Sequence, residues 1–212
     1  MLSSAIDHLV VTAPTLASGI QYVEQTLGCK MQPGGQHPRM GTHNALLKIG
    51  ADCYLEVISI DPDAEPLQRK RWFELDTLLP DTPPRLATWV MRTNDIYKVT
   101  KATDLALGAV EEMSRGTLEW QITIPSDGRL PLQGLAPAVI QWKGEANPAL
   151  KLAESSVSLL QLAGLHPDAR YITALLNAAN FEGPFSVVEP SDGVSIGLTA
   201  TFQTPKGLIV LS

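Results

Sequence analysis

His8 and Glu56 are ionisable residues within segments that are otherwise mainly apolar. His8 belongs to the run 6–11 and Glu56 to the run 53–58, both rich in apolar and β-branched residues as strands are. A carboxylate buried among apolar neighbours is costly unless a metal, a proton or a donor compensates it. An imidazole binds metals or moves protons near neutral pH. The pair therefore suggests a metal or acid–base site, against the alternatives of a strand histidine bonded to a carbonyl and a solvent-facing edge glutamate.

The composition is that of a soluble globular protein without a nucleic-acid surface. The chain has 212 residues, 44% of them hydrophobic, and a net charge of −6 from 22 acidic and 16 basic residues. Nucleic acids and anionic membranes need concentrated positive charge, and the cluster 69–71 is too short to supply it. No apolar run approaches a membrane span, and no basic segment opens a secretory signal. Cys29 and Cys53 form no disulfide framework. We expect a reduced, cytoplasmic protein.

A strand–helix unit occurs twice with the same spacing. A strand over 6–11 precedes a helix that ends at Gly28, and a strand over 86–91 precedes a helix that ends at Gly108. His8 and Thr88 each stand twenty positions before the terminating glycine. Because strand-like segments follow each helix, both units are predicted to be βαβββ modules.

These units predict an α+β chain of three modules. The first two span 1–58 and 85–143, and a proline-containing linker over 59–84 carries a short helix over 68–79. A degenerate third module spans 150–212.

The chain resembles the glyoxalase-like domain family of the vicinal oxygen chelate superfamily, which includes glyoxalase I, extradiol dioxygenases and bleomycin-resistance proteins. The resemblance is carried by the segments IDHLV (6–10), GGQHPRMGTHN (34–44), YLEVI (54–58) and WVMRTND (89–95). It implies that two βαβββ modules pair to form a cup-shaped mixed sheet. One fold carries many chemistries, so it implies less about the reaction.

Strand alternation and the resemblance together indicate which side chains enter the cup. With His8 facing inward, Ile6 and Val10 share its face. The resemblance implies metal ligands from four positions, here His8, Glu56, Thr88 and Gln141. Thr88 is a poor ligand, so His8, Glu56 and Gln141 are the candidate metal ligands, with His8 and Glu56 as catalytic candidates. The cofactor would be Mn, Mg, Fe, Ni or Zn, or none.

Further side chains are candidates for contact with a small-molecule ligand. The Gly/Pro-rich segment 34–44 is expected to form the mouth of the cup, although turn residues can also serve only the backbone. Trp89 and Trp142 are expected to face the helices as core residues. The substrate-binding candidates are His37, Thr42, His43, Asn44, Thr88, Arg115 and Trp120.

Two functions of different class remain open. One is a metal-assisted lyase, isomerase or dioxygenase-like enzyme acting on a small oxygenated metabolite. The other is a metal-free protein that binds or sequesters a small molecule, as bleomycin-resistance proteins do. Neither involves nucleic acid or membrane. A homodimer is expected because the third module leaves sheet edges to cover.

Overall fold

The first module has the order strand, helix and three strands. The computed structural model describes residues 1–144 and 147–212. The helix begins at a capping box, in which Thr15 and Ser18 satisfy each other's backbone N–H groups, and ends at Gly28 with φ of 72°. Its elements are β1 (Ser4–Thr12), α1 (Leu16–Leu27), β2 (Gln32–His37), β3 (Thr42–Lys48) and β4 (Tyr54–Ile60).

The second module repeats this order with a shorter helix. The helix was expected to end at Gly108 but ends at Lys101. The expected helix over 68–79 is also wrong, since only a 3-10 turn at Leu75–Thr77 forms in that segment. The elements are β5 (Arg85–Thr93), α2 (Ile96–Lys101), β6 (Ala109–Arg115), β7 (Leu118–Ile124) and β8 (Ala138–Trp142).

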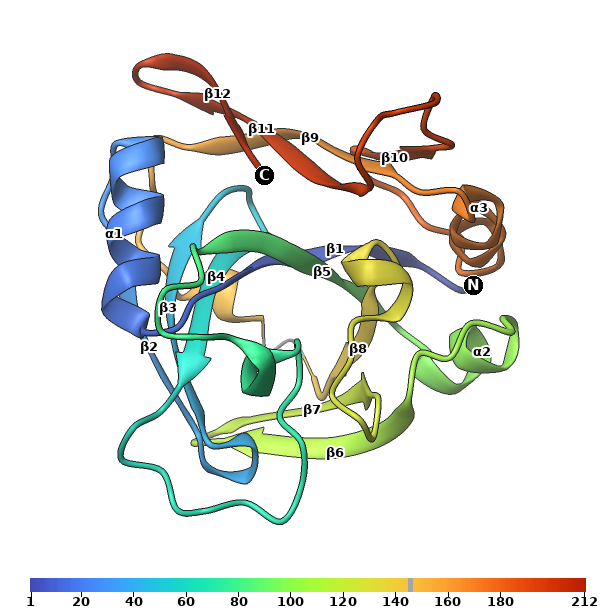
Figure 1. Ribbon diagram of the computed structural model, residues 1–212. Helices are drawn as coiled ribbons and strands as arrows, with labels where there is room; N and C mark the ends of the chain where they lie inside the picture. The colour runs from blue at the N-terminus through green and yellow to red at the C-terminus, as the bar shows by residue number, and fades with distance from the viewer. Residues whose placement is uncertain (145–146) are drawn as a thin grey trace.

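The two modules share one curled sheet of eight strands. Its order is β2-β3-β4-β1-β5-β8-β7-β6, and the antiparallel pair β1–β5 joins the modules. The outermost strands approach each other across the open side of the curl (Figure 1). There Arg39 Nη2 lies 2.5 Å from Glu111 Oε2, and Arg39 Nη1 donates to the Glu112 carbonyl at 2.5 Å. The paired βαβββ modules and the cup are therefore confirmed.

The third module adds a separate four-stranded sheet on the outside of β1 and β5 (Figure 1). Its strand order is β10-β9-β11-β12. Apolar residues such as Leu162, Ala200 and Phe202 pack into the same core as Leu9 and Trp89. The expected homodimer stays a prediction. The elements are β9 (Ser158–Leu165), α3 (Ala169–Ala178), β10 (Phe185–Val188), β11 (Gly197–Thr204) and β12 (Gly207–Leu211).

The start of the chain is fastened to this third module. Ser4 Oγ donates to the Ala179 carbonyl at 2.9 Å, and the backbone N–H of Glu182 donates to the Ser4 carbonyl at 2.9 Å. Asn180 Nδ2 also donates to the Leu2 carbonyl at 3.1 Å. The strand that carries His8 is thus held at its beginning by residues 175 or more positions later in the sequence.

A β-bulge in β1 changes which residues face the cup. Ile6 pairs with Met91 and His8 pairs with Val90, so Asp7 is the extra residue. Val10 lies in the core inside the cup, whereas Ile6 packs with Leu9 outside it. The expectation that Ile6 shares the face of His8 is therefore wrong, because simple alternation breaks at the bulge.

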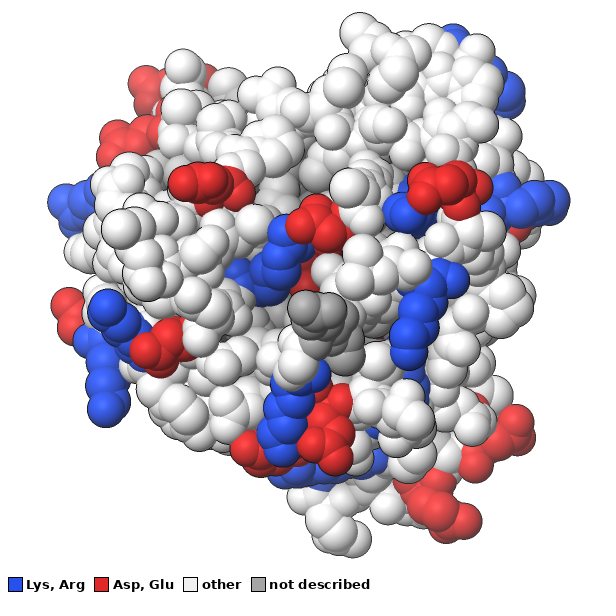
Figure 2. Space-filling view, turned by 180° about the vertical axis from the view of Figure 1, so that it is seen from behind, with Lys and Arg blue, Asp and Glu red and all other residues white. Residues whose placement is uncertain are grey.

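The described surface mixes charges of both signs. Figure 2 shows acidic and basic side chains close together across the back of the molecule, without a broad basic patch on that face. Among the described residues, no helix combines the length and apolar character that crossing a membrane requires.

Candidate functional site

A small cavity inside the first half of the cup gathers most of the chemically capable side chains. Its free volume is about 30 Å³, close to the share of one water molecule in the liquid. Strands of both modules and the linker contribute to its walls. The lining residues are His8, His37, Asn44, Tyr54, Glu56, Trp72, Phe73, Arg115, Trp120, Ile122, Ile140 and Trp142.

His8 lies between two carboxylates at the centre of this site. Its Nδ1 is 2.6 Å from Asp7 Oδ1, and its Nε2 is 3.6 Å from Glu56 Oε2. All three side chains are buried, with Asp7 completely inaccessible to solvent. The β-bulge makes the first contact possible because it brings Asp7 and His8, neighbours in sequence, into the same hydrogen-bonded group. Asp7 fixes the ring and directs Nε2 towards Glu56.

Asn44 and Arg115 orient the other side of Glu56. Asn44 Oδ1 accepts hydrogen bonds from the Gly35 N–H at 2.7 Å and from Arg115 Nη1 at 3.3 Å. Its Nδ2 therefore faces Glu56 and donates to Oε1 at 2.5 Å. Gly35 and its neighbour Gly34 allow this close approach, since a Cβ on Gly34 would lie 2.0 Å from Asn44 Oδ1. Glu56 keeps Oε2 as the oxygen directed at His8.

His37 is held as a neutral imidazole. Burial is the main cause that lowers the pKa of His37 to about 3, and the positive charge of Arg115 acts in the same direction. Arg115 Nη1 donates to His37 Nε2 at 3.0 Å, so the ring proton lies on Nδ1, 3.2 Å from Thr42 Oγ1. His37 thus serves as an acceptor that positions Arg115, and Thr42 supports it without lining the cavity.

Aromatic side chains wall the acid–base group. Tyr54 stacks on His8 with ring centroids 4.5 Å apart, and burial raises the pKa of its hydroxyl well above the usual value. Trp142 Nε1 donates to Asp7 Oδ2 at 2.8 Å and packs against Trp120. Trp142 was expected to face the helices with Trp89, but it faces the cup.

The register of β8 explains why Gln141 does not enter the cup. Its Oε1 accepts the Ile96 N–H at 2.8 Å, at the start of α2. Val10 lies beside Glu56 in the β1–β4 pair, and Val90, eighty positions after Val10, lies beside Ala138 in β5–β8. Ala138, and not Gln141, therefore occupies the position that matches Glu56. The expected convergence of four side chains is wrong at Gln141.

Thr88 lies in a second small cavity in the other half of the cup. This cavity has about 20 Å³ of free volume and includes Ala138 among its lining residues. The Thr88 hydroxyl donates to the Gly134 carbonyl at 2.9 Å. Trp72 and Phe73 from the linker line both cavities and divide the two halves. Thr88 and Ala138 thus stand where the first half has His8 and Glu56, so these two positions carry no matching acid–base pair.

Four of the proposed ligand-contact residues line the first cavity with His8 and Glu56. These are His37, Asn44, Arg115 and Trp120. His43 is next to Asn44 in sequence, but it lines a groove outside the cup. Alternation along β3 turns neighbouring side chains to opposite faces of the sheet. The segment 34–44 is also more regular than expected, since it contains the end of β2. Sequence reasoning missed four residues of the site, namely Asp7, Tyr54, Trp72 and Trp142.

The donor set does not complete a metal centre. His8 and Glu56 remain as candidate ligands on one cavity, while Gln141 caps α2 and His37 Nε2 accepts from Arg115. Residues 1–144 and 147–212 contain no group of three or more His, Cys, Asp or Glu side chains arranged to hold a metal ion. Glu56 instead meets the neutral donor Asn44. The residues described here do not fit the four-ligand metal site that the resemblance implies.

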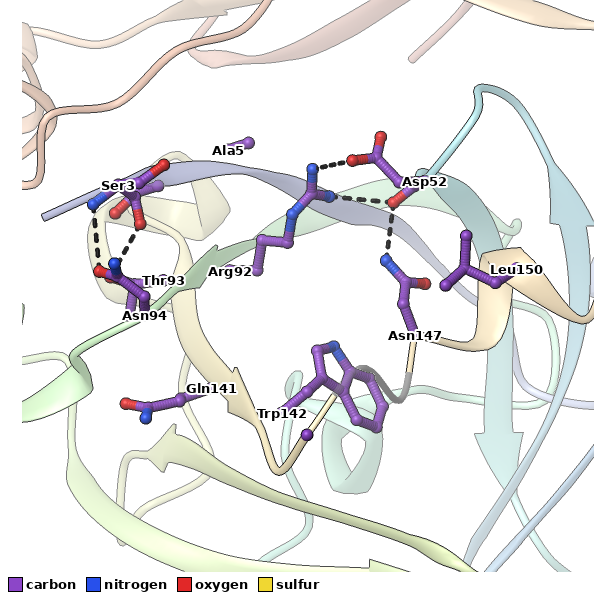
Figure 3. A pocket seen from close by; sticks show the side chains of 12 residues that line it. Ser3, Ala5, Asp52, Arg92, Thr93, Asn94, Gln141, Trp142, Asn147 and Leu150 are labelled. Carbon is purple, nitrogen blue, oxygen red and sulfur yellow. Dashed lines mark hydrogen bonds and ion pairs between the residues drawn. The ribbon is translucent and has the colours of Figure 1, made fainter. Parts of the chain in front are cut away.

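A larger hollow is a surface groove on the other side of Trp142. Its volume is about 730 Å³, and its residues include Gln141, Arg92, Asp52 and Asn147. Figure 3 shows Arg92 and Asn147 both directed at Asp52. Arg92 Nη1 donates to the Ile6 and Asp52 carbonyls at 2.7 and 2.9 Å, and Asn147 Nδ2 donates to the Asp52 carbonyl at 2.9 Å. These polar groups bind one another, so the groove lacks the reactive arrangement of the cup.

Comparison with known proteins identifies the sequence family. The profile of the family described as "Glyoxalase-like domain" matches residues 6–179, most of the chain. This confirms the resemblance inferred from the sequence. No curated protein matches the chain.

Solved structures of similar fold are distant in sequence. A hypothetical protein from Staphylococcus aureus is 16% identical, covers 98% of this chain and 84% of its own, and has a TM-score of 0.58. Methylmalonyl-CoA epimerase from Mycobacterium tuberculosis is 15% identical over 66% of this chain and 88% of its own, with a TM-score of 0.41. A hypothetical protein from Bacillus halodurans C-125 is 12% identical over 72% and 99%, with a TM-score of 0.41. The first similarity supports the fold, and none of them supports an activity.

Proposed function

The chain belongs to the glyoxalase-like domain family, and we propose that it is an isomerase or lyase acting on a small oxygenated metabolite. The reaction begins with removal of a proton from the carbon next to a carbonyl group of that metabolite. The observation that carries this proposal is the buried Asp7–His8–Glu56 group, with contacts of 2.6 and 3.6 Å. A histidine oriented by one carboxylate and directed at a second is a typical acid–base arrangement.

The proton transfer uses His8 and Glu56 as acid and base. Either His8 Nε2 or Glu56 Oε2 takes a proton from the carbon next to the substrate carbonyl, and the C–H electron pair becomes the enolate. Return of that proton to the neighbouring carbon or oxygen completes an isomerisation. Loss of a leaving group from the enolate completes a lyase reaction. Both atoms reach one substrate carbon because they lie 3.6 Å apart.

Arg115 and Asn44 supply the electrostatic part of the reaction. Arg115 lines the cavity and places a positive charge beside Asn44 and His37, which would stabilise a developing oxyanion. Asn44 holds Glu56 Oε1, so that the carboxylate cannot rotate freely. The surrounding rings of Tyr54 and Trp120 lower the local dielectric and strengthen these interactions.

Metal-assisted forms of the reaction, dioxygenase chemistry included, require ligands beyond His8 and Glu56. Gln141 and Thr88 do not supply them, since their polar atoms bind the Ile96 N–H and the Gly134 carbonyl. An assay with and without added Mn²⁺ measures the contribution of a metal separately.

Hydrogen–deuterium exchange at carbon tests the proposal directly. The protein is incubated in D₂O with dihydroxyacetone or hydroxypyruvate, and loss of the C–H signal is followed by proton NMR. We expect wild type to accelerate exchange, and Glu56→Gln and His8→Gln to lose about 100-fold or more of the acceleration. Glu119→Gln is the matched control, because Glu119 pairs with Lys143 on the surface of β7. Exchange that is equally fast in wild type and Glu56→Gln would refute the assignment.

A binding or sequestering protein is the second candidate, and the incomplete set of metal ligands favours it. Gln141 and Thr88 bind the Ile96 N–H and the Gly134 carbonyl, and Ala138 stands where the first half has Glu56. For this function the same NMR samples would show binding of the compounds, by line broadening, without exchange in any variant. The two functions therefore give opposite results in one experiment.

A further inference from the structure

The linker between the modules forms a cover over the cup. We define the strap as residues 61–84, which run from the end of β4 to the start of β5 across the mouth of the cup (Figure 1). Arg69 donates twice to Glu111 at 2.7 Å, and these hydrogen bonds lower the pKa of Glu111. Because Glu111 also binds Arg39, one carboxylate ties the strap to the meeting point of the two outermost strands.

The strap holds two aromatic residues inside the cup by an unusual backbone. Phe73 and Glu74 both adopt left-handed φ angles, 57° and 56°, which non-glycine residues rarely do. Glu74 is fixed there because its N–H donates to the Gly128 carbonyl at 2.8 Å and its Oε1 accepts the Leu130 N–H at 3.2 Å. Trp72 stacks on Phe73 with ring centroids 5.4 Å apart. The strained turn thus keeps Trp72 inside the site.

The Trp72 indole N–H has no partner among residues 1–144 and 147–212. Trp72 is only 5% exposed, and its Nε1 atom is fully buried. The indole N–H groups of Trp89 and Trp142, in contrast, donate to the Leu135 carbonyl and to Asp7. Buried polar groups normally have hydrogen-bond partners, so an exception needs an explanation. Here the donor belongs to a side chain that lines the His8–Glu56 cavity as well as the cavity at Thr88.

We propose that Trp72 is a ligand-binding residue whose indole N–H donates a hydrogen bond to an oxygen of the molecule held at His8 and Glu56. The proposal rests on the function proposed above, and it adds that the strap contributes to substrate recognition. The ligand class is a small molecule with neighbouring oxygens, one directed at Arg115 and the other at Trp72. Both residues line the same cavity, and His37 contacts both, by a hydrogen bond to Arg115 and edge-to-face with Trp72 at 5.3 Å.

Replacement of the indole by phenylalanine separates a binding role from a packing role. Trp72→Phe keeps an aromatic ring on Phe73 but removes the unpartnered N–H. We expect the ligand-free variant to melt at the wild-type temperature or above, because a buried unpaired donor is lost. Trp89→Phe is the matched control, since its N–H is paired away from the cup, and its melting temperature should fall.

Acetohydroxamic acid, which is uncharged at neutral pH and carries oxygens on two adjacent atoms, serves as the probe. By isothermal titration calorimetry we expect about tenfold weaker binding to Trp72→Phe than to wild type, as for one lost hydrogen bond, and unchanged binding to Trp89→Phe. A lower melting temperature of Trp72→Phe with wild-type affinity would overturn the role of Trp72 alone. Absence of binding to wild type would overturn this proposal, whereas the exchange assay with Glu56→Gln tests the proposed reaction independently.

Discussion

Protonation of His37 should destabilise the fold. Burial lowers the pKa of His37 to about 3 in the folded protein, from an unfolded value near 6.5. Below pH 6.5 the unfolded chain therefore binds a proton that the folded chain does not, and stability falls as the pH falls. Above pH 6.5 this contribution is fully present. The pH window of the effect extends from about 6.5 down to about 3.

The size of the effect follows from the difference between the two pKa values. Each pH unit within the window costs about 1.4 kcal/mol, so a change from pH 7.5 to pH 5.0 should cost about 2 kcal/mol through His37 alone. The appropriate variant is His37→Gln, whose amide can still accept from Arg115 and donate to Thr42. Carboxylates titrate in both proteins, and their contribution cancels in the comparison.

Urea denaturation of wild type and His37→Gln at both pH values measures this contribution. We expect the free energy of unfolding of wild type to fall by about 2 kcal/mol more than that of the variant between pH 7.5 and pH 5.0. The NMR signals of the His37 ring in the folded protein should also remain those of neutral imidazole at pH 5.0. An equal pH dependence in both proteins, or a ring that titrates near pH 6, would refute the reasoning.

Three further predictions concern partners seen in the structure. Trp142→Phe leaves the buried Asp7 Oδ2 without its donor and should lower stability by about 1–3 kcal/mol in urea denaturation, whereas unchanged stability would mean that the bond contributes nothing. Iodoacetamide should modify Cys29 before Cys53 in peptide mass spectra, because burial raises the pKa of both thiols but much further for Cys53; faster labelling of Cys53 would contradict its burial. Gly134→Ala should destabilise the fold far more than Gly116→Ala in thermal melts. Both glycines have positive φ, but only a Cβ added at Gly134 would meet the Ala87 carbonyl oxygen, at 1.8 Å. Equal losses of stability would show that backbone conformation alone decides the effect.

The repeated pattern of strands and helices was enough to predict the cup and the inward direction of its two main residues. His8 and Glu56 lie in strands whose apolar composition leaves alternation easy to follow, and the structure brings them within 3.6 Å. The same alternation failed at Ile6, because a bulge at Asp7 depends on pairing with β5 and has no clear mark in the local sequence.

Residues of the second module were harder to place. The spacing of twenty positions aligned Thr88 with His8, but the distance along the chain from β5 to β8 differs from that between β1 and β4. Gln141 was therefore assigned to the wrong face. The position of Trp72 could not be inferred from periodicity at all, because it lies in an irregular segment held by long-range contacts of Glu74 and Arg69.

The fastening of Ser4 to residues 179–182 has a consequence for the order in which the protein is completed during synthesis. The strand with His8 leaves the ribosome before the third module does, yet its outer apolar residues Leu9 and Val11 share a core with Leu162 and Phe202. All residues of the acid–base group have been synthesised once β8 is complete, but the face behind β1 stays uncovered until the last third of the chain arrives. During that interval a nascent chain exposes the apolar outer face of β1, and exposed apolar surface of this kind is where chaperones bind and aggregation begins.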